Sequence, residues 1–493
     1  MSQRLSNATL NELPGDVARP RYDRGASGIG IVHLGVGAFH KAHQAVYTDD
    51  ALAAAGGDWA IAGVSLKRPE ARDRLAPQDY LYTVAECDNN GSRPRVIGAL
   101  KTMLVAPENP KAVLELMARA ATRVITLSIT EKGYCLRPAD GTLDFAHPDI
   151  AFDLAGNNTP RSAVGIIAGA LALRRARGVP APGIVSCDNL PNNGVRLRNA
   201  VLGFLRARDA DLADWCARHV AFPSTMVDRI VPATTDLDID ALQRGLGVHD
   251  AACVKTEPFR QWIIEDRFTQ PRPAWEAGGA RFVKDVAPFE QAKLRLLNGA
   301  HSAIAYLSCL GGQAYVHDAM RDPLLSGFIR DLMELELAPT LPRNDEPDLP
   351  NYMKSLRQRF NNAALQHATA QIAMDGSQKL PPRLLAPIRE RLAAGLPINR
   401  LALIVAAWMR GTLEHDERGR ALVFSDPLAS RIRAAVKAVS GPDQMARSLL
   451  RIREIFGDDL PADPRFVGAV LNGLSRLMRH GVAATLRAFA TQQ

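Results

Sequence analysis

The fold of this chain is decided by GIGIVHLGVGAFH, residues 28–40. The apolar run over residues 28–34 indicates a buried strand, and residues 41–55 after the glycines have helical composition. Strand, glycine turn and helix form the context of a dinucleotide-binding turn, in which Gly35 and Gly37 let the backbone approach a pyrophosphate. His40 replaces the third glycine of the usual GxGxxG pattern. The motif alone therefore indicates cofactor binding no more strongly than a plain tight turn.

Strand-like and helical segments alternate after this turn, which is typical of a parallel sheet covered by helices. The expected strands are residues 59–66, 124–129 and 183–187, and the expected helices are residues 110–121 and 162–177. From residue 288 onward the pattern becomes helical, with almost no strand signal. The sequence predicts the α/β class, with a Rossmann-type dinucleotide-binding domain over residues 1–287. A mostly α-helical substrate and catalytic domain is predicted over residues 288–493.

The cofactor expected at the glycine turn is NAD, with NADP left open. The strand over residues 59–66 is followed by Lys67 and Arg68, where an NAD-binding domain usually has an acid for the ribose hydroxyls. Glu70 could serve in place of that acid, whereas Lys67 and Arg68 could attract the 2′-phosphate of NADP. The residues expected to contact the cofactor are Gly35, Val36, Gly37, Ala38, Phe39, His40 and Glu70.

Composition excludes several classes of protein. The net charge of +8 is spread over 493 residues without a basic block interleaved with aromatics, so no nucleic-acid partner is expected, although a basic chain suits anionic small substrates. Six cysteines without CxxC pairing argue against a zinc site or a disulfide framework and for a reducing compartment. Without an apolar leader or a run of eighteen apolar residues, we expect a cytoplasmic protein that does not enter a membrane. The oligomeric state is left open.

Residues 288–301, PFEQAKLRLLNGAH, place four polar side chains among helix-forming apolar residues. At about 100° per residue, Glu290, Lys293, Asn298 and His301 fall on one side of a helix, beside an apolar stripe. This pattern is typical of a cleft wall. On local grounds the alternatives are a solvent-facing lysine on an amphipathic helix and a histidine satisfied in the core. No metal is expected, because no helix carries a His pair at i, i+4 with an acid.

A lysine in this setting suits hydride-transfer chemistry. Hydride loss from a carbinol carbon requires removal of the hydroxyl proton, and the pKa of a desolvated lysine can be lowered toward neutrality for that task. Lys293 would be the base, and Glu290, one turn earlier, could pass its proton to solvent. The side-chain amides of Asn189 and Asn298 could stabilise the developing alkoxide.

Three expected loops supply further candidates. Asn189 lies in residues 188–194, whose composition is also that of a plain turn. Asp228, in residues 222–229, could hold a substrate hydroxyl together with His301, or could form only a surface ion pair with Arg229. Lys379, in residues 375–381, could reach a cleft or only water.

Residues 293–301 resemble the KxxxxNxxH signature of the polyol-specific long-chain dehydrogenases, the mannitol dehydrogenase family. The resemblance extends over nearly the whole chain through HLGVGAFHKAHQ at 33–44, SCDN at 186–189 and DGS at 375–377. It implies a Rossmann-type domain, a helical domain and NAD(H). The roles implied are catalytic base for Lys293, oxyanion hole for Asn189 and Asn298, proton gate for Glu290, and substrate binding for Asp228, His301 and Lys379.

Two branches of this family differ in substrate: mannitol 2-dehydrogenases act on a neutral hexitol, and fructuronate reductases interconvert D-fructuronate and D-mannonate. The chain is more similar to the second branch, with Lys132 where the first tends to carry glycine and Gln371 where it can carry arginine. Lys132, Arg260 and Lys379 are the candidates for contact with a substrate carboxylate. A mannitol 2-dehydrogenase, which converts mannitol to fructose, or a related polyol dehydrogenase is the alternative enzyme. A protein that binds NAD without catalysis is the alternative outside enzymes, and the complete Lys293, Asn298 and His301 set argues against it.

Overall fold

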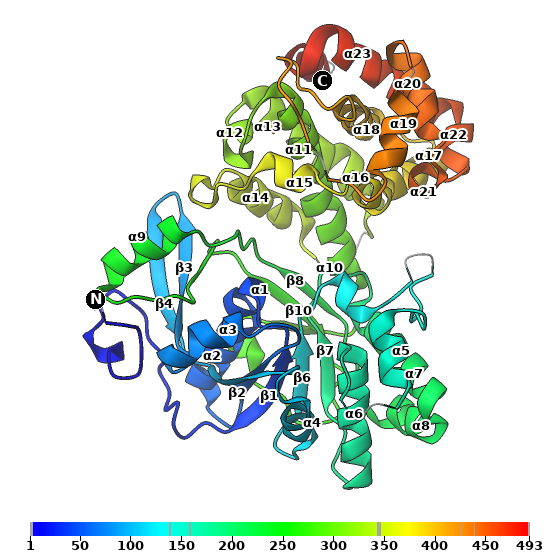
Figure 1. Cartoon of the computed structure of the whole chain (residues 1–493). Coiled ribbons are helices and arrows are strands. Elements are labelled where there is room, and N and C mark those ends of the chain that lie inside the picture. The colour runs from blue at the N-terminus through cyan, green and yellow to red at the C-terminus, as the bar shows by residue number, and fades with distance from the viewer. Residues whose placement is uncertain are drawn as a thin grey trace. The chain divides into compact units, whose positions relative to one another are not determined.

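The computed structural model describes residues 3–137, 140–156, 159–342, 347–423, 425–437 and 439–491. The chain divides into two compact units, residues 1–287 and 288–493 (Figure 1). Among the described residues, no helix is both long enough and apolar enough to cross a membrane.

The first unit is built on a five-stranded parallel sheet in the order β5-β2-β1-β6-β7. Its strands are β1 (Ile29–Leu34), β2 (Ala60–Ser65), β5 (Leu100–Val105), β6 (Val124–Leu127) and β7 (Gly183–Ser186). Side chains of β1 alternate between two hydrophobic clusters, with Ile31 on one face and Val32 and Leu34 on the other. Burial on both faces explains why these strands appear as continuous apolar runs in the sequence.

Helices cover both faces of this sheet (Figure 1). On one side lie α4 (Pro110–Ala118), α6 (Ala163–Ala176) and α7 (Asn193–Arg208), and on the other lies α2 (Gln44–Ala55). The side chains of Asn109 and Ser162 accept hydrogen bonds from backbone N–H groups at the starts of α4 and α6, which explains where these helices begin. The strand order reverses between β1 and β6, which is the position where open α/β sheets bind ligands.

Two three-stranded sheets complete the first unit. One contains β4 (Gly91–Ile97), β3 (Tyr82–Asp88) and β9 (Val254–Thr256), and the other contains β11 (Arg281–Val283), β10 (Gln261–Glu265) and β8 (Thr225–Asp228). The prediction of a loop over residues 222–229 is therefore wrong, because residues 225–228 form the buried strand β8. This strand is stabilised by antiparallel pairing with β10, in which Asp228 lies opposite Gln261. Pairing between distant segments cannot be recognised in four residues of sequence.

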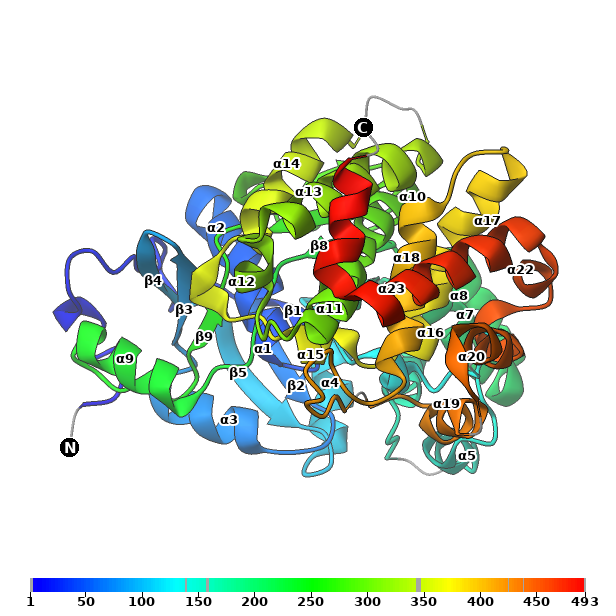
Figure 2. The same cartoon turned by 90° about the horizontal axis from the view of Figure 1, so that it is seen from above.

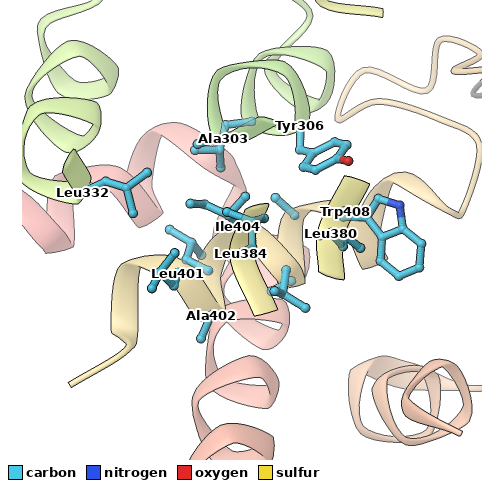
Figure 3. Close-up of a cluster of buried hydrophobic side chains, with 14 of the residues drawn as sticks. Ala303, Tyr306, Leu332, Leu380, Leu384, Leu401, Ala402, Ile404 and Trp408 are labelled. Atoms are coloured by element: carbon cyan, nitrogen blue, oxygen red, sulfur yellow. The ribbon is translucent and has the colours of Figure 1, made fainter. Parts of the chain in front are cut away.

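The second unit is helical, and no strand occurs among its described residues. Its single large core surrounds α11 (Ala300–Gly311) and α18 (Asn399–Gly411). Figure 2 shows α23 (Pro464–Ala490) lying against α18, with a kink at Gly481. Figure 3 shows part of this core, where Ile404 of α18 lies beside Leu384 and Ala303. The apolar side chains on these helices account for the long helical periodicity of residues 288–493.

The helix predicted around Lys293 is continuous but not uniformly α-helical. It consists of α10 (Ala287–Ala292), the π-helical segment η5 (Lys293–Gly299) and α11. A π-turn contains more residues than an α-turn, so the projection at about 100° per residue misplaces the side chains after Lys293. Two further π-helical segments are η6 (Leu332–Leu337) and η9 (Pro381–Leu385).

The loop predicted over residues 375–381 is also wrong, because α16 (Gly376–Leu380) runs directly into η9. Its start is held by Asp426, whose carboxylate accepts hydrogen bonds from the backbone N–H and the hydroxyl of Ser377. Asp375 itself adopts a left-handed conformation, with φ of 55°. The turn-forming residues therefore stop where α16 begins. The Asp426 carboxylate, distant in sequence, takes the place of a capping side chain next to the helix.

Candidate active site

Gly35 and Gly37 shape the turn after β1 in different ways. Gly35 has φ of +92°, and a Cβ there would lie 2.4 Å from the carbonyl oxygen of Ser128, so only glycine fits. The Gly37 N–H donates to the Gly35 carbonyl at 2.8 Å, and a Cβ at Gly37 would meet nothing within 4 Å. The turn therefore presents open space beside the first N–H groups of α1 (Ala38–Ala42), which have no intrahelical partner. These features fit the pyrophosphate of a dinucleotide.

His33 and His40 stack on each other across this turn. Their ring centroids are 3.4 Å apart with an interplanar angle of 17°, and both side chains are buried. The ring nitrogens of His33 lie 2.8 Å from the Thr126 hydroxyl and 3.0 Å from the Ser128 hydroxyl. Burial lowers the pKa of His33 to about 3 and that of His40 well below its usual value, so both rings are neutral. The side chain of His40 thus packs inside the protein, in the place of the third glycine.

The other expected cofactor contacts differ in exposure. Val36 is buried, Phe39 is half-buried and Ala38 is exposed. Glu70 begins α3 (Glu70–Leu75) as an exposed residue, beyond the exposed Lys67 and Arg68. No acid follows β2 directly.

The carboxyl ends of β6 and β7 are joined by Asp188, which sequence reasoning did not single out. Its carboxylate accepts hydrogen bonds from the backbone of Ile129 at 3.0 Å and Thr130 at 2.8 Å, and from the Tyr134 hydroxyl at 2.7 Å. Burial raises the pKa of Asp188, while these three hydrogen bonds act in the opposite direction. The carboxylate therefore anchors η3 (Glu131–Tyr134), which carries the exposed Lys132, beside the exposed Asn189.

Replacing Asp188 by Asn is expected to lower the free energy of unfolding by about 1–3 kcal/mol, because a buried acceptor of three hydrogen bonds loses part of its capacity. Chemical denaturation measures this change. The matched control is Asp140→Asn, since Asp140 also accepts backbone and hydroxyl hydrogen bonds but is exposed. Equal losses in the two variants would contradict the anchoring role of Asp188.

Asp228 lies at the end of β8 and is only 2% exposed. The neighbouring Arg229 is buried, and its guanidinium donates to the Glu86 carboxylate at 2.5 Å and to the Glu257 carbonyl. The alternative of a surface ion pair between Asp228 and Arg229 is therefore wrong. Burial of both side chains removes them from the solvent that such a pair requires.

Arg260 is held between α2 and the residues before β11. Its Nη2 donates to the Asp50 carboxylate at 2.6 Å and to the Gly278 carbonyl at 3.1 Å, and its guanidinium lies 4.7 Å from the Tyr47 ring centroid. Nη1 is buried and has no hydrogen-bond partner among the described residues. One of its donor groups thus remains available for a further acceptor.

In the second unit, Lys293 and Asn298 both lie on η5, and His301 follows in the first turn of α11. Lys293 is 8% exposed and His301 is 6% exposed, which contradicts the alternative of a solvent-facing lysine. The His301 ring lies 4.7 Å from that of Phe360 and 5.3 Å from that of His367, between centroids. Its Nε2 is buried without a hydrogen-bond partner among the described residues. Burial, followed by the nearby positive groups, lowers the pKa of His301 well below its usual value.

Two cations flank this group. The Lys379 ammonium donates to the Ile372 carbonyl at 3.1 Å, and burial together with Arg383 lowers its pKa. Arg383 donates through Nη1 to the carbonyl of Asn298 at 3.3 Å and to the Ser302 hydroxyl at 3.2 Å. Among the described residues, neither cation has a carboxylate within ion-pair distance. Sequence reasoning missed Arg383 and His367, and no local pattern marks either of them.

The predicted residues thus fall into three groups. The glycine turn, Asn189 and Lys132 lie at the carboxyl edge of the parallel sheet in the first unit. Asp228 and Arg260 lie on or next to the sheet that contains β8 and β10. In the second unit, Lys293, Asn298 and His301 lie along one helix, and Lys379 of α16 is near enough to His301 to lower its pKa. No group of residues suited to a metal ion occurs in the described part of the chain.

Two family models match the sequence: the mannitol dehydrogenase Rossmann domain over residues 29–277 and the mannitol dehydrogenase C-terminal domain over residues 285–478. The chain belongs to the mannitol dehydrogenase family. This confirms the predicted family and the predicted α/β class with a helical C-terminal region. As a mannitol dehydrogenase family member, the protein is an oxidoreductase acting on CH–OH groups.

Relatives within the mannitol dehydrogenase family include proteins from both branches. The chain is 45% identical to the D-mannonate oxidoreductase of Escherichia coli over 94% of this chain and 96% of that protein. It is 40% identical to the mannitol 2-dehydrogenase of Phaeosphaeria nodorum over 99% of this chain and 86% of that protein. Its structure is similar to that of Pseudomonas fluorescens mannitol 2-dehydrogenase in ternary complex with NAD and D-mannitol, with a TM-score of 0.88, 39% identity and complete coverage of both chains.

Proposed function

We propose that this protein is an NAD-dependent oxidoreductase that interconverts D-fructuronate and D-mannonate. The positive surroundings of His301 carry this proposal, because among the described residues Lys379 and Arg383 have no carboxylate within ion-pair distance and suit an anionic sugar acid. The 45% identity to a D-mannonate oxidoreductase supports the same branch. A mannitol 2-dehydrogenase or related polyol dehydrogenase is the second candidate, favoured by the full-length similarity to the mannitol complex.

In this proposal, residues 1–287 form the dinucleotide-binding domain. The turn from Gly35 to His40 would hold the pyrophosphate through its backbone, with Glu70 near the adenosine ribose. The bound cofactor would supply the hydride chemistry, with NAD⁺ as the hydride acceptor in oxidation and NADH as the hydride donor in reduction. The exposed Lys67 and Arg68 keep NADP as a second possibility, because both could pair with a 2′-phosphate.

Residues 288–493 would form the substrate and catalytic domain. In oxidation, the Lys293 amine takes the proton of the reacting hydroxyl, and in reduction the Lys293 ammonium returns it to the carbonyl oxygen. The amides of Asn298 and Asn189 donate hydrogen bonds to that oxygen. Glu290 exchanges the proton of Lys293 with solvent.

The remaining candidates would bind the rest of the substrate. His301 and Asp228 hold neighbouring hydroxyl groups. Lys379 contacts the carboxylate, and Lys132 and Arg260 are further candidates for that contact, because hydrogen bonds between charged groups are stronger than neutral ones. We also propose a cytoplasmic location, which the six buried free thiols support.

Absorbance of NADH, followed with D-fructuronate, D-tagaturonate and D-fructose and repeated with NADPH, tests this function. D-Fructuronate with NADH is expected to give the highest kcat/KM. In a Lys379→Gln variant, kcat/KM for D-fructuronate is expected to fall at least about tenfold, because a charged hydrogen bond is lost, while that for D-fructose changes little. Lys354→Gln, at an exposed lysine of the same unit, is the control. Turnover of D-fructose without turnover of D-fructuronate would contradict the proposed substrate and favour the polyol dehydrogenase.

A further inference from the structure

We propose that Arg383 is a positioning residue, whose guanidinium holds the π-helical turn that carries Lys293 and Asn298. The inference rests on the proposed function only in assigning the reaction to Lys293 and Asn298. Every contact used here lies within residues 288–493.

Arg383 spans the point where the catalytic helix changes its hydrogen-bond pattern. The π-helical segment η5 ends at Gly299, and α11 begins at Ala300, whose N–H is shared between the carbonyls of Leu296 and Leu297. Arg383 bonds to the carbonyl of Asn298 before this junction and to the hydroxyl of Ser302 after it. A single guanidinium therefore forms hydrogen bonds on both sides of the transition from π-helix to α-helix.

The element that carries Arg383 gives it a defined position. Arg383 lies in η9, which follows α16 without a break and begins with two prolines, so the backbone there has little freedom. The next residues, Leu384 and Leu385, are buried in the helical core, and Figure 3 shows Leu384 there. A backbone anchored on both sides leaves the guanidinium few alternatives to the contacts with Asn298 and Ser302.

A half-buried cation without a counter-ion is costly, which argues against a role in stability alone. Arg383 has no carboxylate within ion-pair distance among the described residues, whereas the buried Arg295 of the same unit pairs with Glu390 at 2.6 Å. π-helical turns also occur frequently at functional sites. The arrangement is therefore better explained by the placement of Asn298 and Lys293 than by the folding of η9.

Arg383 also acts on the charge state of its neighbours. The titratable and charged groups that act on His301 are His367, Arg359, Arg383 and Lys379, and all of them lower its pKa. Lys379 is affected by Arg383 and, in the opposite direction, by Asp375 and Asp426. Removal of the Arg383 charge should thus raise the pKa of both His301 and Lys379, whereas a lysine in its place should keep much of this effect.

Two variants separate geometry from charge. Arg383→Lys keeps the charge but cannot span Asn298 and Ser302 in the same way, and Arg383→Gln removes the charge as well. For both, kcat is expected to fall about ten- to a hundredfold, with the dissociation constant for NADH within about twofold of wild type. Only Arg383→Gln is expected to move the limbs of the pH profile of kcat/KM to higher pH. An Arg383→Lys variant that folds and keeps kcat within threefold of wild type would overturn the proposal.

Arg391 provides the matched control. It is a buried arginine two turns further on, and it donates to the carbonyls of Pro397 and of Glu336, the latter in the π-helical segment η6. Arg391→Lys should lower Tm but leave kcat within about threefold of wild type. A loss of kcat in Arg391→Lys as large as in Arg383→Lys would show that any weakened π-helix has this effect, and would overturn the specific role of Arg383.

Hydrogen exchange tests the same inference without any substrate. In both Arg383 variants, amides at the junction from Gly299 to Ala303 are expected to exchange faster, whereas in Arg391→Lys they are not. Ser302→Ala removes one contact of Arg383 without a change of charge, and it replaces the Arg383 variants if these do not fold. In Ser302→Ala the same amides are expected to exchange faster. If the substrate panel shows no turnover, the proposed function fails while this measurement still decides the role of Arg383. Unchanged exchange at the junction in the folded variants would overturn it.

Discussion

Turnover by a Lys293→Ala variant is expected to be at least about a hundredfold lower than that of wild type, with nearly unchanged affinity for NADH. Lys293 is the side chain proposed to take the hydroxyl proton in oxidation and to return it in reduction. It lies in the second unit and the glycine turn lies in the first, so truncation of Lys293 leaves the proposed pyrophosphate contacts in place. Single-turnover kinetics and NADH titration, read by fluorescence, measure the two quantities separately.

The control for this variant is Lys354→Ala, which removes an exposed lysine from α14 (Leu349–Phe360) in the same unit. It should keep wild-type turnover and Tm. Turnover by Lys293→Ala within a factor of three of wild type would remove lysine from the mechanism. A large rise in the dissociation constant for NADH would instead assign Lys293 to the binding of the cofactor.

Gly35→Ala is expected to lower the free energy of unfolding by about 2–6 kcal/mol, the sum of backbone strain at positive φ and of overpacking. The added Cβ would approach the Ser128 carbonyl oxygen to 2.4 Å, and this oxygen belongs to backbone that cannot rotate away. The turn would therefore have to move, and NADH affinity should fall with stability. Urea denaturation and NADH titration measure the two effects.

Gly37→Ala separates binding from folding. A Cβ at this position would meet no protein atom within 4 Å, and the φ of Gly37 is −105°, which any residue adopts. Stability should change by less than about 1 kcal/mol, whereas NADH affinity should fall because the methyl group occupies space proposed for the pyrophosphate. If the two alanine variants were equally unstable, or if Gly37→Ala bound NADH like wild type, the description of the turn would be incorrect.

The features that could be predicted from sequence are those encoded locally. The strands of the parallel sheet are continuous apolar runs because both faces of the sheet are buried, and helices α4 and α6 start at the capping residues Asn109 and Ser162. The strand β8 was not predicted because the residues that pair with it in β10 lie 33 to 39 positions further along the chain, from Asp228–Gln261 to Thr225–Ile264. Its four residues contain no signal that distinguishes a strand from a loop.

The candidate site also divides into residues that the local sequence marks and residues that depend on distant segments. Lys293, Asn298 and His301 lie close together in sequence, so their spacing and the family resemblance are enough to mark them as candidates. Asp188 and Arg383 bind partners that are distant in sequence. Asp188 accepts from the backbone of Ile129, 59 residues away, and Arg383 donates to the carbonyl of Asn298, 85 residues away. The π-helical form of η5 was not predicted because its residues are ordinary helix formers, and the extra residue per turn depends on tertiary contacts.

The stacked rings of His33 and His40 set a limit on the conditions in which the glycine turn persists. Neither imidazole can take up a proton in the folded turn near neutral pH, because burial lowers both pKa values. In the unfolded chain both would have a pKa near 6.5. The contribution of these two histidines to the free energy of unfolding is therefore fully present above about pH 6.5. It decreases as the pH falls, because the unfolded chain binds protons that the folded turn excludes. The proposed cofactor site thus loses stability in acid for a reason that does not involve Lys293, the proposed acid–base residue.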